Sequence, residues 1–142
     1  MNTHGDIIII EDNADDRDIL ISIFEELGQE HNYENRLVFI EDATHVIDFL
    51  KSDDCDPFLI ISDINMPVIN GFDLRNLIFN DAKLRERAIP FIFLTTSDSS
   101  EENMRKAFQL SIQGYFTKPI SYTKFKKVIN DILTYWKNAA TN

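Results

Sequence analysis

Three acidic side chains directly follow two short apolar stretches of this chain, an arrangement that could do chemistry. Glu11 and Asp12 come after Ile7–Ile10, and Asp63 comes after Phe58–Ser62. Carboxylates that lie close together repel one another and need a cation, and hard oxygen ligands with open water positions suit Mg²⁺. An aspartate held beside such a cation is also a nucleophile for a phosphoryl group. The pattern therefore predicts a phosphoryl-accepting site at Asp63.

A hydroxyl and an ammonium complete the set, because Thr95 and Lys118 each follow a further apolar stretch. Both groups can hold phosphate oxygens, the lysine by charge and the threonine by hydrogen bonding. Taken alone, Asp63 also fits a turn or a helix cap, and Lys118 also fits a surface lysine. A cis peptide bond between Lys118 and Pro119 is a further alternative.

The elements that must position these residues alternate between two hydrophobic periods. Continuous apolar runs with β-branched residues predict five buried strands, at Ile7–Ile10, Asn35–Ile40, Phe58–Ile61, Pro90–Leu94 and Gly114–Thr117. Helical spacing predicts five helices: Asp15 to Gly28, a short one through Val46, Ile47 and Leu50, Phe72 to about Asp81, one starting at Ser99 or Ser100, and one through Phe125 and Trp136.

Strands that alternate with helices predict an α/β fold, a doubly wound five-stranded parallel sheet with helices on both faces. Right-handed crossovers bring the carboxyl ends of all the strands to one edge of the sheet. We therefore expect the chemistry-bearing residues to converge there: Glu11, Asp12, Asp63, Thr95 and Lys118.

Several local features carry their own expectations. Gly28 is expected to end its helix as a C-cap. The charged segment 83–87 is read as a connection between a helix and a strand. Leu77 is expected to point inward, and the next helix is expected to bury a stripe of Met104, Ala107, Phe108 and Leu110.

The totals limit what the chain can do. Its 142 residues suit a single domain, residues 1–142, with no output domain, and the net charge of −10 opposes binding to DNA or to an anionic membrane. The single Cys55 stands among acids that raise a thiol pKa, which disfavours a reactive cysteine. The chain shows no signal peptide and no apolar run of membrane-spanning length, so we expect a cytoplasmic location.

At this point the residues resemble a known family. The chain is similar to the receiver domains of two-component response regulators, of the stand-alone chemotaxis-regulator type. The similarity covers residues 6 to about 137. It rests on an ordered set of motifs: Glu11-Asp12-Asn13, Ser62-Asp63-Ile64-Asn65-Met66-Pro67 with Gly71, Leu94-Thr95-Thr96 and Lys118-Pro119. The segment 81–88 and the ending Ile132-Leu133-Thr134-Tyr135-Trp136 also resemble small receivers paired with phytochrome-like kinases.

The resemblance implies a flavodoxin-like sheet with strand order 2-1-3-4-5. It implies that Asp63 accepts phosphate from a sensor histidine kinase or a phosphotransfer protein. Mg²⁺ would be bound by Asp63, by Asp12 directly, by Glu11 largely through water and by the backbone carbonyl of Asn65.

The resemblance also assigns the switch. Thr95 would be the switch hydroxyl, Lys118 would pair with the phosphoryl group, and Tyr115 would turn inward on activation. The surface of the last two helices and the strand between them would then change for a protein partner. Packing alone is the alternative role for Tyr115. Thr96 stands where the family often has alanine, which would narrow access to the phosphoryl group.

The favoured function is thus a phosphoacceptor switch and not a turnover enzyme. One alternative is a Mg²⁺-dependent aspartyl-phosphate hydrolase of the haloacid-dehalogenase type, but that chemistry wants an acid where this chain has Asn65. A nucleotide-binding protein is disfavoured because no glycine-rich loop follows Ile10. The lysines of the last helix fit a solvated face or a site for an acidic kinase domain. Tyr135 and Trp136 fit either core burial or a homodimer surface.

Overall fold

A computed structural model describes residues 2–96 and 101–139 of the chain. Its centre is one sheet of parallel strands in the order β2-β1-β3-β4-β5, which confirms the expected topology. The strands are β1 (Asp6–Ile10), β2 (Leu37–Ile40), β3 (Pro57–Ser62), β4 (Phe91–Thr95) and β5 (Gly114–Thr117).

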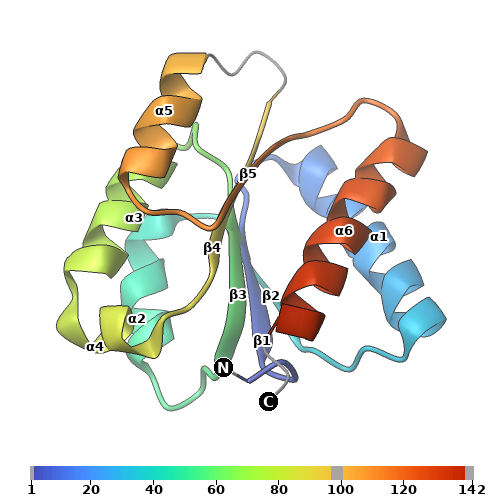
Figure 1. The fold of residues 1–142 in the computed structure, drawn as a ribbon, viewed down its shortest axis with the longest axis horizontal. Coiled ribbons are helices and arrows are strands. Elements are labelled where there is room, and N and C mark those ends of the chain that lie inside the picture. The colour runs from blue at the N-terminus through green and yellow to red at the C-terminus, as the bar shows by residue number, and fades with distance from the viewer. Residues whose placement is uncertain (1, 97–100, 140–142) are drawn as a thin grey trace.

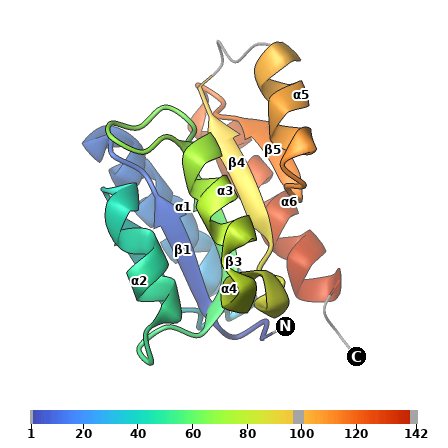
Figure 2. The same ribbon diagram turned by 90° about the vertical axis from the view of Figure 1, so that its left-hand side faces the viewer.

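Helices cover both faces of the sheet (Figures 1 and 2). On one face lie α1 (Ala14–His31) and α6 (Tyr122–Ala139). On the other lie the short 3₁₀ helix η1 (Ala43–His45), α2 (Val46–Lys51), α3 (Gly71–Asn80), α4 (Ala82–Arg87) and α5 (Glu101–Gln109). No helix in the described ranges is both long enough and apolar enough to span a bilayer.

Two hydrophobic layers, one on each face of the sheet, hold this arrangement together. There are two because successive side chains of a strand point to opposite faces. In β1, Ile8 and Ile10 join the layer under α2, α3, α4 and α5, whereas Ile7 and Ile9 join the layer under α1 and α6. Most apolar residues at helical spacing in α1 and α6 are buried, and Ile19 and Val128 are partly buried. The buried ones are Leu20, Ile23, Phe24, Leu27, Phe125, Ile129, Ile132 and Leu133. Trp136 packs partly against the same layer, while Tyr135 is exposed.

The helix α4 is a correction to the expected count of five. Its sequence looks like a charged connection, yet the carboxylate of Asp81 accepts hydrogen bonds from the backbone of Lys83 and Leu84, both at 3.1 Å. This cap satisfies the free amides of the first turn, and Leu84 is buried. A six-residue helix therefore forms from one cap and one anchor, too little to show a hydrophobic period.

The end of α1 is a second correction. Gly28 does not end the helix, which continues to His31. Asn32 adopts the left-handed conformation instead, with a φ of 57°, and its amide bonds to the Gly28 carbonyl. Asparagine tolerates this conformation, so it serves as the cap in place of glycine.

The prediction that three further side chains point inward is also wrong. Leu77 of α3 is 47% exposed, and Met104 and Phe108 of α5 are 43% and 54% exposed. Only Ala107 of the predicted α5 stripe is fully buried, with Leu110 packing at its edge. Ala107 is the residue by which α5 joins the core, and the larger Met104 and Phe108 stay largely in solvent. The expected start of this helix at Ser99 or Ser100 lies outside the described residues.

Candidate functional site

The end of β1 places two acids at the carboxyl edge of the sheet. Ile10 pairs with Ile40 on one side and Ser62 on the other, so the residues after Ile10 emerge between two strands. The Glu11 side chain is only 2% exposed, and one of its oxygens accepts the amide of Asn13 at 3.1 Å. Asp12 is exposed. One acid is thus held under the edge and the other faces solvent.

Asp63 lies beside these acids because β3 pairs with β1. Its amide donates to the carbonyl of Ile10 at 3.1 Å, which extends the sheet by one residue. Its Oδ1 accepts the amide of Ile64 at 2.7 Å. The Asp63 side chain is 7% exposed, and Oδ2 is the oxygen turned to the rest of the site.

Gly71 makes this placement possible at the start of α3. Its amide bonds to the Ile64 carbonyl at 2.8 Å, so the loop returns tightly over Asp63. A Cβ at this position would lie 2.4 Å from the Asp63 carbonyl oxygen and 2.8 Å from a ring carbon of Phe93. Only glycine allows that approach without moving the backbone.

Lys118 reaches the acids from the end of β5. Its amide donates to the Thr95 carbonyl at 2.6 Å, and its peptide bond to Pro119 is trans, so the cis alternative is wrong. The Nζ atom donates to Glu11 Oε2 at 2.6 Å and to Asp63 Oδ2 at 3.2 Å. The side chain is only 7% exposed. The ammonium therefore bridges the two buried acids of the edge.

The cluster contains a fourth acid, which the sequence analysis does not predict. Asp16, in the first turn of α1, accepts from Lys118 Nζ at 2.9 Å. Its side chain is 28% exposed. The signal was present, because Asp16 stands four residues after Asp12 and Asn13 is a good N-cap. An acid in the first turn is usually explained by its favourable interaction with the helix dipole. Its position in the sequence therefore does not by itself indicate a site residue.

The electrostatics of the site follow from burial and pairing. Burial raises the pKa of Glu11 above its ordinary value, although Lys118 opposes this shift. Burial alone would lower the pKa of Lys118, but its hydrogen bonds to Glu11 and Asp16 outweigh burial and raise that pKa. The ammonium therefore stays charged across the whole neutral range.

The acids also suit a metal ion. One carboxylate oxygen from each of Glu11, Asp12 and Asp63 lies within 4.8 Å of the others. Three hard anionic oxygens, two buried and one open to solvent, are a donor set that a small divalent cation such as Mg²⁺ prefers. The residues present thus fit a divalent cation at the edge of the sheet.

The remaining predicted residues lie around this centre. Thr95 is buried at the end of β4 and stands opposite Thr117 in the sheet. Tyr115 pairs with Phe93, and the two rings make an edge-to-face contact at 6.4 Å. The Tyr115 hydroxyl is buried without a hydrogen-bond partner among the described residues. Asn65 is exposed two residues beyond Asp63.

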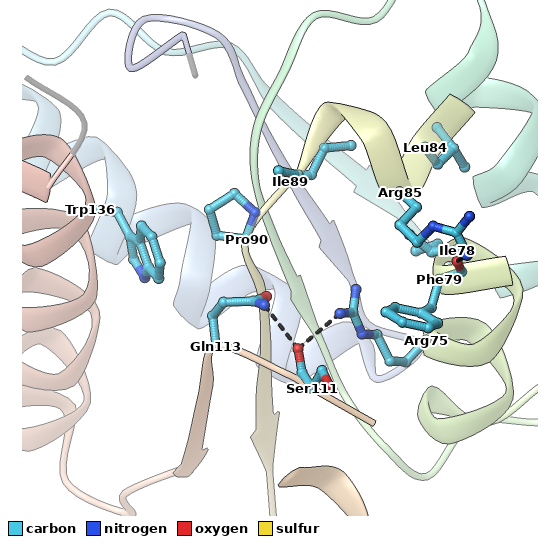
Figure 3. Close-up of a pocket in the computed structure, with 11 residues that line it drawn as sticks. Arg75, Ile78, Phe79, Leu84, Arg85, Ile89, Pro90, Ser111, Gln113 and Trp136 are labelled. Atoms are coloured by element: carbon cyan, nitrogen blue, oxygen red, sulfur yellow. Dashed lines mark hydrogen bonds between the residues drawn. The ribbon is translucent and has the colours of Figure 1, made fainter. Parts of the chain in front are cut away.

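A separate cavity of about 250 Å³ lies between α3, α4 and the start of β4, and Trp136 lines its far side (Figure 3). Arg75 lies within it and is only 6% exposed. Its guanidinium donates to the carbonyls of Leu110 at 3.0 Å and Ser111 at 2.8 Å. These carbonyls lie directly after the C-terminus of α5, where a positive charge is favoured by the helix dipole. We therefore read Arg75 as a cap that ties α5 to α3.

Comparison with known proteins agrees with this geometry. A family model described as "Response regulator receiver domain" matches residues 7–130. The chain is 28% identical over 134 residues to the probable methanogenesis regulatory protein FilR2 of Methanothrix harundinacea, an alignment that covers 92% of this chain and 82% of that protein.

Two solved structures share the fold. One is the phosphorylated cyanobacterial phytochrome response regulator RcpA, with a TM-score of 0.83, 25% identity and 97% of each chain covered. The other is the Mn²⁺-bound response regulator Rcp1, with a TM-score of 0.80, 22% identity, and 96% of this chain and 97% of that one covered.

Proposed function

This chain belongs to the response regulator receiver domain family, and we propose that it is a phosphoacceptor switch with Asp63 as the accepting residue. The observation that carries the proposal is the buried Lys118 ammonium, which bridges Glu11 and Asp63. Buried acids without a counter-charge destabilise a fold. A cluster of acids beside a buried lysine at one edge of the sheet therefore needs a functional explanation. Phosphoryl transfer supplies it.

The proposed step uses the oxygens as they stand. Asp63 Oδ1 is engaged by the Ile64 amide, and Oδ2, which Lys118 Nζ contacts at 3.2 Å, is the oxygen that would attack. A bond forms between Oδ2 and the phosphorus, and the bond from phosphorus to the donor breaks. A phosphohistidine donor leaves as imidazole, taking the electron pair and then a proton from water. Mg²⁺ held by Glu11, Asp12, Asp63 and the Asn65 carbonyl would neutralise charge on the phosphoryl oxygens.

Residues of this chain would then convert the new charge into a change of shape. Lys118 would pair with one phosphoryl oxygen, and the Thr95 hydroxyl would approach another. Tyr115 would follow, since its ring packs against Phe93, which lies two residues before Thr95 on the same strand. A movement of Thr95 at the end of β4 would be transmitted toward α5, where Met104 and Phe108 expose apolar side chains.

We propose the face formed by α5, β5 and α6 as the output surface. Its partner would be a protein or a second copy of the chain. Two structural observations support a protein partner: the exposed apolar side chains of α5, and Tyr135 exposed on α6. Sedimentation with and without phosphorylation would separate a homodimer from a complex with another protein.

We propose a sensor histidine kinase or a phosphotransfer protein as the donor. The likeness to RcpA, whose name describes a phytochrome response regulator, favours a phytochrome-like kinase. The alternative of a haloacid-dehalogenase type hydrolase gains no support from the relatives, and Asn65 cannot supply the second acid that its chemistry needs.

The deciding experiment is the intact mass of the protein after incubation with acetyl phosphate and Mg²⁺. Wild type should gain one phosphoryl group, acetate leaving with the electron pair, and the adduct should be absent with EDTA. Asp63→Asn keeps the side-chain volume and should gain nothing. A phosphoryl group on the variant would place the acceptor elsewhere. A wild type that neither gains the group nor binds beryllium fluoride by ¹⁹F NMR would overturn the proposal.

A further inference from the structure

The ammonium of Lys118 has three N–H donors, and three different acids take them. Glu11 accepts at 2.6 Å, Asp16 at 2.9 Å and Asp63 at 3.2 Å. The contact with Asp63, the acceptor in the proposed function, is thus the longest of the three. The other two acids hold the ammonium away from it.

Asp16 differs from the other two acids in its place in the structure. Glu11 and Asp63 belong to the trio that could hold a cation, and Asp16 does not. Its amide is bound to the Asn13 side chain at 3.0 Å, which secures the first turn of α1. Asp16 is therefore a partner of Lys118 for which a cation does not compete.

The position of Lys118 matters for the attacking oxygen. Lys118 contacts Oδ2 of Asp63, the oxygen that the Ile64 amide leaves available. A contact with Oδ2 shorter than the present 3.2 Å would draw more electron density from that oxygen, and it would crowd the line of approach to phosphorus. Without Asp16, a cation bound by Glu11 and Asp63 would leave Lys118 with no carboxylate partner that the cation does not share.

We propose that Asp16 is a positioning residue, which anchors Lys118 beside the acceptor and keeps it from closing onto Asp63 Oδ2. The inference rests on the proposed function, because it assigns a task within that same site. Asp16 acts through Lys118 and does not itself touch the phosphoryl group.

The first test is the rate of phosphorylation by acetyl phosphate at saturating Mg²⁺. Asp16→Asn should slow the reaction about fivefold or more, and Asp16→Glu should restore most of the rate. The matched control is Asp15→Asn, which removes the same charge from the same exposed helical turn and should leave the rate within twofold. An unchanged or faster Asp16→Asn variant would overturn the inference, as would equal slowing by Asp15→Asn.

The second test needs neither metal nor phosphate. Urea unfolding in EDTA of wild type, Asp16→Asn, Lys118→Ala and the double variant should show strong coupling, with the Asp16 substitution costing little once Lys118 is gone. Additive effects would mean that the pair does not interact. If wild type is never phosphorylated but the coupling is present, the proposed function fails while the contact stands. If wild type is phosphorylated and Asp16→Asn matches it, only this inference fails.

Discussion

The Nζ atom of Lys118 lies 2.6 Å from Oε2 of Glu11, a hydrogen bond between residues 107 positions apart in the chain. Both side chains are almost fully buried, at 7% and 2% exposed. The pair joins the end of the first strand to the end of the last. Because it links the first and last strands of the chain through the site, we expect stability and function to be coupled there.

Lys118→Ala should lower the free energy of unfolding by about 3 kcal/mol in EDTA, because it leaves the buried carboxylates of Glu11 and Asp63 without their counter-ion. Saturating Mg²⁺ should raise the stability of both the variant and wild type, because it binds the same acids in each. Urea unfolding with and without Mg²⁺ measures both effects. Lys127→Ala, which removes an exposed ion pair with Asp131, is the control and should cost less than about 1 kcal/mol. A similar loss in both variants would argue against the buried bridge.

The same Lys118→Ala variant should still bind Mg²⁺ with affinity close to that of wild type, since Lys118 is not a ligand. It should fail to show the phosphorylation-induced change at Tyr115. Comparing the NMR shifts of Tyr115 before and after beryllium fluoride addition measures this. A complete change in the variant would make Lys118 a bystander in the switch.

Gly71→Ala should destabilise the protein by about 2 kcal/mol and slow phosphorylation, because the new Cβ would meet the backbone oxygen of Asp63 at 2.4 Å. Thermal or urea unfolding measures the loss of stability. The rate of the acetyl phosphate reaction measures the slower phosphorylation. Gly28→Ala is the control. Its Cβ would meet only the Tyr33 oxygen at 3.4 Å, so the gain in helix propensity should stabilise by up to about 1 kcal/mol. Equal effects at the two glycines would contradict the close approach.

Val68→Asn should stabilise the protein by about 1 kcal/mol, because Val68 holds a φ of 67° that is strained for a β-branched residue. The strain comes from a tight turn in which the Ile69 amide bonds to the Pro67 carbonyl at 2.8 Å. Val68 is 85% exposed, so little packing is lost on substitution. Val68→Ile keeps the branching and should be neutral in the same urea titration. A destabilised Val68→Asn variant would show that the turn is not strained.

Cys55 should resist alkylation by iodoacetamide at pH 8 in the folded protein and react readily once unfolded. Burial, with a smaller contribution from Asp6, raises the pKa of this thiol to about 11 from 9.0. A raised pKa adds stability that is complete below pH 9 and is lost as the pH rises toward about 11. Unfolding titrations from pH 7 to pH 11 should therefore be flatter for Cys55→Ala than for wild type. Rapid labelling of the native protein would contradict this.

Much of the fold and site could be predicted from the chain alone, because the information is local or periodic. Ile7–Ile10 and Phe91–Leu94 are apolar without interruption, which is typical of strands buried on both faces. Parallel strands share one carboxyl edge, so the acids at Glu11, Asp12 and Asp63 had to meet.

What only the tertiary structure decided depends on distances between separate elements. In the sequence, Asp16 resembles any acid in the first turn of a helix. Only the folded chain brings α1 beside the end of β5, where Asp16 pairs with Lys118. Met104 and Phe108 have the spacing of buried residues, yet Ala107 is the residue of α5 that is buried. Helical periodicity marks which side of a helix is apolar. How deeply that side is buried depends on the size of its central residue and on the neighbours it meets, and these are properties of the packed molecule.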